Sequence, residues 1–192
     1  MRSALIVLLI VVPPMVLAGV MRTQETPKRF AEVEAGSLYR GGFPTATQIR
    51  HLHDEFGVRT VITLTSDEGG PRDTELDAIV NELKLNRYRF PMNGDGTGEI
   101  KTLDNAANAL AVAKDRPIFF HCAAGDKRSS ATLGAYWMKH KGKSLRQTLD
   151  DLTRDYGMKF DDEDRELAKH LSRYAAYIGM KAEPPTTQPN EQ

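Results

Sequence analysis

Short apolar runs alternate with amphipathic stretches through the middle of the chain. Runs rich in β-branched and aromatic residues predict strands, and apolar residues spaced three or four apart predict helices. The predicted strands are 38–40, 60–65, 86–92 and 117–122, and the predicted helices are 45–56, 73–83, 99–114, 129–140, 144–155 and 161–178. Thr45 is placed to cap the first helix and Gly57 to end it. This alternation predicts an α/β fold with a central, mainly parallel sheet of four to five strands and helices on both faces.

The first 21 residues have a different pattern. Arg2 precedes a continuous apolar stretch, two prolines interrupt it, and small residues surround Ala18. The pattern predicts a secretory signal peptide cleaved near Ala18, or an uncleaved membrane anchor. We therefore expect a protein that is exported (periplasmic or extracellular), or one attached to a membrane through residues 3–21.

The segments on either side of the periodic region are polar. Residues 22–35 lack periodicity and are predicted to be a linker, and residues 183–192 are proline-rich and predicted to be a disordered tail. One folded domain at 36–182 remains between them.

Composition narrows the function classes. The 192 residues include 26 Lys and Arg against 26 Asp and Glu, so the formal net charge is zero. A dedicated nucleic-acid binder usually has a basic excess, so we expect no nucleic-acid partner. Cys122 is the single cysteine of the sequence, so an intramolecular disulfide is excluded. Its thiol either fills space in an apolar core or takes part in chemistry.

The surroundings of Cys122 favour chemistry. An apolar strand ends in His121-Cys122, a short loop Ala123-Ala124-Gly125-Asp126-Lys127 follows, and Arg128-Ser129 opens a helix. A tight loop that enters a helix points several backbone N–H groups at one centre, and the helix dipole adds positive potential there. A thiolate or a phosphate fits such a centre, and an arginine can bind two phosphate oxygens at once.

These residues resemble the signature of the cysteine-dependent protein tyrosine phosphatase superfamily: His-Cys, five residues, then Arg-Ser/Thr. Leu38-Tyr-Arg-Gly-Gly-Phe-Pro44 and the segment 57–64 are similar to the opening of its dual-specificity-like bacterial, plant and fungal branch. The resemblance covers about residues 36–155. It implies a phosphatase that acts on a phosphorylated protein or small molecule and needs no metal or cofactor.

The resemblance also implies roles for residues. Cys122 attacks phosphorus and forms a cysteinyl-phosphate, and residues 123–128 bind the phosphate. His121 orients the loop, and Ser129 helps the sulfur leave. An aspartic acid on a separate loop protonates the leaving oxygen. Asp95, in a glycine-rich loop, fits this role, with Glu99 and Asp126 as alternatives.

Some features depart from the family pattern. Lys127, rather than an aspartate, stands directly before the arginine, and a lysine there would favour substrates with extra negative charge, such as phosphoinositides. The usual Trp-Pro-Asp of the acid loop is also absent. The alternatives are therefore a phosphoinositide phosphatase and a pseudophosphatase that binds phosphorylated ligands. A sulfurtransferase is a further alternative, since some rhodanese-like loops also carry a cysteine at a strand–helix turn, but the spacing to Arg128 and the preceding His121 favour phosphate over sulfur.

Plainer interpretations stand beside the functional ones. Cys122 can be a buried filler, Arg128 the partner of an ion pair at a helix start, and Asp95 an ordinary turn residue. His121 can be a core histidine bonded to the backbone. Arg40 can lie near the site, but we expect a surface arginine.

Overall fold

The computed structural model describes residues 25–66 and 68–180. The predicted signal peptide or anchor at 1–21 and the predicted tail at 183–192 therefore lie outside the described residues. Within the described part of the chain, no helix is both long enough and apolar enough to span a membrane.

The sheet has five strands of four residues each, and its strand order is β1-β2-β5-β3-β4. The strands are β1 (Ala31–Glu34), β2 (Leu38–Gly41), β3 (Thr60–Thr63), β4 (Asn86–Arg89) and β5 (Ile118–His121). β2, β5, β3 and β4 are parallel neighbours, and β1 pairs antiparallel with β2. The prediction of a mainly parallel sheet is confirmed.

The edge strand β1 corrects the prediction of a linker at 22–35. It is only partly buried, and its pairing with β2 is irregular between Glu32 and Glu34. A half-exposed edge strand with two glutamates has no continuous apolar run, so its sequence looks like a linker.

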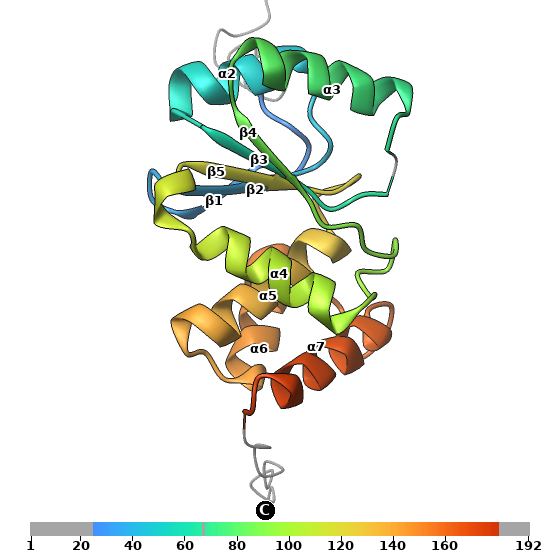
Figure 1. The fold of residues 1–192 in the computed structure, drawn as a ribbon. Helices are drawn as coiled ribbons and strands as arrows, with labels where there is room; N and C mark the ends of the chain where they lie inside the picture. Colours follow the sequence, from blue (N-terminus) through green and yellow to red (C-terminus); the bar gives the residue numbers. More distant parts are fainter. Residues whose placement is uncertain (1–24, 67, 181–192) are drawn as a thin grey trace, which may run out of the picture.

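Helices cover both faces of the sheet (Figure 1). The helices are α2 (Ala46–Phe56), α3 (Pro71–Glu82), α4 (Ile100–Ala111), α5 (Lys127–Lys141), α6 (Leu145–Tyr156) and α7 (Arg165–Tyr177), with one 3₁₀ turn, η1 (Ala113–Asp115). Figure 1 shows α2 and α3 on one side of the sheet and α4 to α7 on the other. Thr45 caps α2 through a capping box with Gln48, and Gly57 ends it at a φ of 64°, as predicted.

The central strand β5 divides the core into two clusters. Phe119 packs with residues of α2 and α3, whereas Ile118 and Phe120 pack with residues of the four helices on the other face. Successive side chains of a strand point to opposite faces, so an apolar run with no polar alternation is what a strand covered on both sides requires.

The parallel strands end along one edge of the sheet. Gly41 and Thr63 both pair with His121, and Arg89 pairs with Thr63, so these four residues form one row. The loops that follow the four strands meet at this edge, and ligand sites of such sheets lie there.

Candidate active site

The segment from Cys122 to Arg128, called here the cysteine loop, joins β5 to α5 at the carboxyl edge of the sheet. The residues after β2 clamp it. The Cys122 N–H donates to the Gly41 carbonyl at 3.4 Å, and the Phe43 N–H donates to the Ala123 carbonyl at 3.1 Å. The cysteine loop therefore lies at the edge of the sheet where ligand sites of such folds occur.

Gly125 makes this clamp possible. Its φ is +70°, and a Cβ on it would lie 2.5 Å from the Gly41 carbonyl carbon and 2.6 Å from the Gly42 nitrogen. Only glycine fits a left-handed conformation with backbone this close.

Cys122 is 2% exposed and belongs to the larger apolar cluster, yet its sulfur is not surrounded by hydrocarbon alone. The Asp126 N–H donates to the sulfur at 3.4 Å. Burial alone would raise the pKa of the Cys122 thiol. The Ser129 hydroxyl and the N–H groups of Asp126, Ser129 and Ala124 outweigh burial, so this pKa lies below its ordinary value.

Ser129 follows Arg128 in the first turn of α5. Its hydroxyl is buried and has no hydrogen-bond partner among the described residues. The same hydroxyl helps to lower the pKa of the Cys122 thiol. The supporting role that the resemblance implies for Ser129 stays a prediction.

Arg128 lies in the first turn of α5, which begins two residues earlier than predicted because the Ser130 N–H donates to the Asp126 carbonyl at 2.8 Å. The Arg128 Nε is buried and has no hydrogen-bond partner among the described residues. A buried donor without a partner is costly, so this Nε needs an acceptor that the described residues do not supply.

His121 is a buried, uncharged residue beneath the cysteine loop. Burial, followed by the nearby arginine charges, lowers its pKa to about 3. Its Nε2 lies 3.1 Å from the Thr63 hydroxyl and its Nδ1 lies 3.4 Å from the Cys122 carbonyl. His121 is therefore a core histidine whose ring also contacts the first residue of the cysteine loop, and its role in orienting the loop stays a prediction.

Arg40 corrects the expectation of a surface arginine, since it is 1% exposed. Its Nη2 donates to the Gly125 carbonyl at 3.0 Å, to the Asp126 carbonyl at 3.3 Å and to the Ser130 hydroxyl at 3.0 Å. The sequence contained a clue to this burial, because Arg40 lies within a predicted strand. All four residues of β2 are buried, since the strand lies inside the sheet.

Two ion pairs use charges of the cysteine loop. The Lys127 Nζ lies 2.9 Å from the carboxylate of Asp164, a buried residue just before α7, and this contact raises the Lys127 pKa. The Asp126 carboxylate lies 3.5 Å from Arg29. The Lys127 charge is thus balanced by a carboxylate, which differs from the expectation that it would select for extra negative charge.

The glycine-rich loop that carries Asp95 packs against the start of α5. A Cβ on the buried Gly96 would lie 2.9 Å from the Lys127 carbonyl oxygen. The Asp95 carboxylate itself is exposed and accepts hydrogen bonds from the Thr97 N–H at 2.9 Å and the Thr97 hydroxyl at 2.7 Å. The turn role of Asp95 is therefore observed. The Thr97 N–H lowers the Asp95 pKa, which keeps the group ionised in this conformation.

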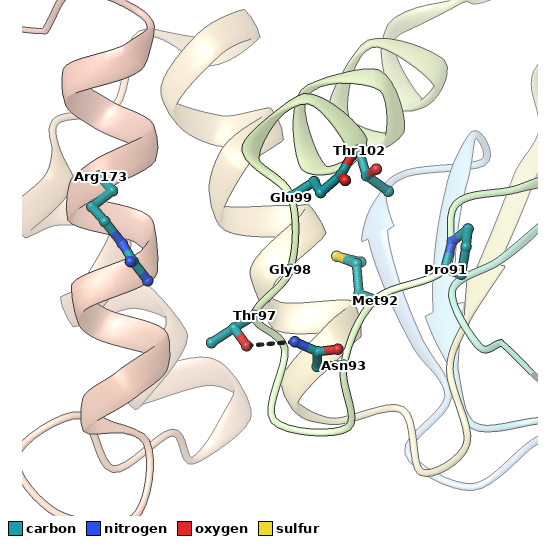
Figure 2. Close-up of a pocket in the computed structure, with 8 residues that line it drawn as sticks. All are labelled: Pro91, Met92, Asn93, Thr97, Gly98, Glu99, Thr102 and Arg173. Atoms are coloured by element: carbon teal, nitrogen blue, oxygen red, sulfur yellow. Dashed lines mark hydrogen bonds between the residues drawn. The ribbon is translucent and has the colours of Figure 1, made fainter.

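The alternative acids have other surroundings. Glu99 is exposed at the start of α4 and lines an open pocket of about 610 Å³, which extends from the Asp95 loop to Arg173 of α7 (Figure 2). Asp126 is engaged by Arg29. Asp95 directly precedes Gly96, whose backbone packs against Lys127 of the cysteine loop. Asp95 is therefore the acidic residue of the glycine-rich loop that lies next in sequence to this contact.

The chain matches a protein-family model described as "PTP-NADK: DSP-PTPase phosphatase fused to NAD+ Kinase" over residues 15–169. The chain belongs to this phosphatase family. The phosphatase is 27% identical over 142 residues to "Inositol diphosphatase DSP3" of Arabidopsis thaliana, a match that covers 72% of this chain and 67% of that protein.

Two solved structures have the same fold as the phosphatase. The core catalytic domain of PP-IP phosphatase SIW14 from S. cerevisiae matches with a TM-score of 0.61 and 20% identity, over 79% of this chain and 93% of that one. P. aeruginosa TpbA matches with a TM-score of 0.58 and 18% identity, over 75% and 89%. The phosphatase is thus a dual-specificity-type, cysteine-dependent hydrolase in both family and fold.

Proposed function

We propose that Cys122 is the nucleophile of a phosphomonoesterase and that Arg128 holds two non-bridging phosphate oxygens. The observation that carries this proposal is the hydrogen bond that the Asp126 N–H donates to the Cys122 sulfur. Six residues after Cys122, the Nε of Arg128 is buried and has no partner among the described residues. Phosphoryl transfer to a thiolate needs a sulfur with a lowered pKa and a cation that can bind the phosphate oxygens, and Cys122 and Arg128 are placed on one loop to provide them.

The reaction has two steps. The Cys122 thiolate attacks phosphorus, the P–S bond forms, the bond from phosphorus to the leaving oxygen breaks, and Asp95 gives that oxygen a proton. Water then attacks phosphorus, the P–S bond breaks, Asp95 takes the proton from the water, and phosphate leaves. Asp95 must release Thr97 to serve as the acid, because its carboxylate accepts two hydrogen bonds from that residue.

The test is hydrolysis of para-nitrophenyl phosphate by the wild type and by Cys122→Ser. The serine variant should lose turnover and keep vanadate binding, since the backbone N–H groups and Arg128 remain. Wild-type turnover by Cys122→Ser would refute the mechanism. A wild type that binds vanadate but hydrolyses no phosphoester would instead identify a pseudophosphatase.

A second candidate is hydrolysis of substrates with several phosphates, such as inositol phosphates. Two of the similar proteins are named as phosphatases of this kind. In this chain, the exposed Arg72 stacks on Phe43 at 4.3 Å, and the Phe43 N–H binds the cysteine loop. Arg72 thus puts an unburied positive charge beside the site, where a second phosphate could contact it.

A substrate panel separates the two candidates. Phosphotyrosine peptide, phosphothreonine peptide, inositol phosphates and a phosphoinositide would be compared in the wild type and in Arg72→Met. If the second candidate holds, Arg72→Met should lower kcat/KM for the multiply phosphorylated compounds and leave para-nitrophenyl phosphate unchanged. Equal effects on all substrates would contradict it.

We also propose that residues 3–21 export the protein or anchor it to a membrane. The support is the apolar stretch of the sequence with its basic start. Cell fractionation of the full chain against a chain that lacks residues 1–21 tests this. Identical distribution of the two chains would count against the proposal.

A further inference from the structure

Arg40 is a buried cation beneath the cysteine loop, and the reaction described above assigns it no role. It comes from β2, is 1% exposed, and directs one nitrogen, Nη2, at three acceptors of the loop and of the first turn of α5. On its other side, the guanidinium carbon lies 4.0 Å from the ring centroid of Tyr156, the last residue of α6. The guanidinium is thus held between the loop and a helix.

The peptide geometry links Arg40 to the sulfur. A peptide unit is planar and trans, so its C=O and its N–H point in opposite directions. The Gly125 carbonyl points at Arg40, and the N–H of the same peptide, which belongs to Asp126, donates to the Cys122 sulfur at 3.4 Å. The Asp126 carbonyl also points at Arg40, which turns the Lys127 N–H of that peptide away from the guanidinium.

The positive charge of Arg40 also favours a thiolate at Cys122. Cys122 and Asp126 are among the groups whose negative charge favours the charged guanidinium, although burial, the largest effect, lowers the Arg40 pKa. Nε and Nη1 of Arg40 are buried without a hydrogen-bond partner in the described part of the chain. A guanidinium keeps its proton even when buried, so its field favours an anion in the loop.

We propose that Arg40 is a positioning residue that orients the peptide N–H groups of the cysteine loop toward the sulfur and the bound phosphate. It does not touch the phosphate itself. It acts through the Gly125 and Asp126 carbonyls, and its charge supports the thiolate from behind. The proposal deepens the proposed function and rests on Cys122 being the nucleophile.

The single cysteine allows a test that does not need turnover. Alkylation by iodoacetamide reports on Cys122 alone, and the pH midpoint of its rate follows the thiolate. Arg40→Met should move this midpoint to higher pH and lower kcat/KM for para-nitrophenyl phosphate by about 10²-fold, as expected for misplaced N–H donors. Arg40→Lys, which keeps the charge but not the fork, should move the midpoint less and still lose about tenfold or more in kcat/KM.

Arg116→Met is the matched control. Arg116 is also a partly buried arginine with several acceptors, among them Glu34, Ser37 and the Leu110 carbonyl, but it lies just before the opposite end of β5. Its variant should lose stability and keep the wild-type alkylation midpoint and kcat/KM within about twofold.

The outcomes are separable. An Arg40→Met midpoint equal to that of Arg116→Met would overturn the proposal. Should Arg40→Met not fold, Arg40→Lys decides, and a folded Arg40→Lys with wild-type kcat/KM would overturn it as well. If the wild type hydrolyses no phosphoester, the proposed function fails, while the alkylation midpoints still judge Arg40.

Discussion

Gly96 lies directly against the backbone of Lys127 at the start of α5. It belongs to the loop 93–98, called here the acid loop after the proposed role of Asp95. A Cβ placed on Gly96 would lie 2.9 Å from the Lys127 carbonyl oxygen, and the Gly96 φ is +86°. The turn that presents Asp95 is therefore docked on the cysteine loop through a residue without a side chain. This contact fixes where the loop lies relative to the start of α5.

Gly96→Ala should displace the acid loop and slow turnover of a poor leaving group more than that of para-nitrophenyl phosphate, which needs less help from an acid. Gly94→Ala is the control, because a Cβ on Gly94 meets nothing within 4 Å. Steady-state kinetics with a phenyl phosphate series would measure this. Equal rates for the two alanine variants would mean that the contact does not position the acid.

The choice of general acid can be tested by removing each carboxylate. Asp95→Asn should lower kcat by about 10²- to 10⁴-fold, since an amide cannot donate the proton. Glu99→Gln, in the pocket wall, should stay near wild type. Kinetics over pH 5–8 provide the measurement, and a large loss in Glu99→Gln alone would move the role to Glu99.

The hydrogen bond between Thr63 and His121 should contribute to stability. Thr63→Val keeps the shape but removes the hydroxyl that lies 3.1 Å from His121 Nε2, so the free energy of unfolding should fall by about 1–3 kcal/mol. Thr148→Val is the control, since the Thr148 hydroxyl is buried and has no partner among the described residues. That variant should be neutral or slightly stabilising in urea unfolding.

Acid should destabilise the fold through His121. Its pKa is about 3 in the folded state, whereas an unfolded histidine has one of 6.5, so between these values the unfolded state binds a proton that the folded state does not. The free energy of unfolding should therefore fall as the pH drops below 6.5. Urea unfolding at pH 7 and pH 5 checks this, and His121→Asn should show a weaker pH dependence. The same slope in both proteins would contradict it.

The sequence predicted the features that depend on local pattern. The apolar run that ends at Cys122, the spacing to Arg128, and the cap and glycine that bound α2 are all visible in neighbouring residues. Each depends on rules that act within a few positions, such as strand burial and helix capping. The layers of the fold follow from the order of these elements.

Features that depend on distant partners were not predictable in this way. Arg40 is buried because loop residues more than 80 positions later provide its acceptors, and Lys127 is paired with a carboxylate 37 residues further on. The turn bonding of Asp95 to Thr97 is local, but its distance from the cysteine loop is set by how Gly96 docks. Such contacts are known only once the chain is folded.

The chain has a single thiol, which bears on how the enzyme tolerates peroxide. Thiolates oxidise to sulfenic acid, and many enzymes recover this state by forming an internal disulfide. The sequence has no second cysteine with which Cys122 could form a disulfide. The sulfenic acid can therefore react only with a thiol from outside the protein or with a backbone nitrogen. In an oxidising compartment, the lifetime of activity would depend on the supply of small reductants rather than on the fold.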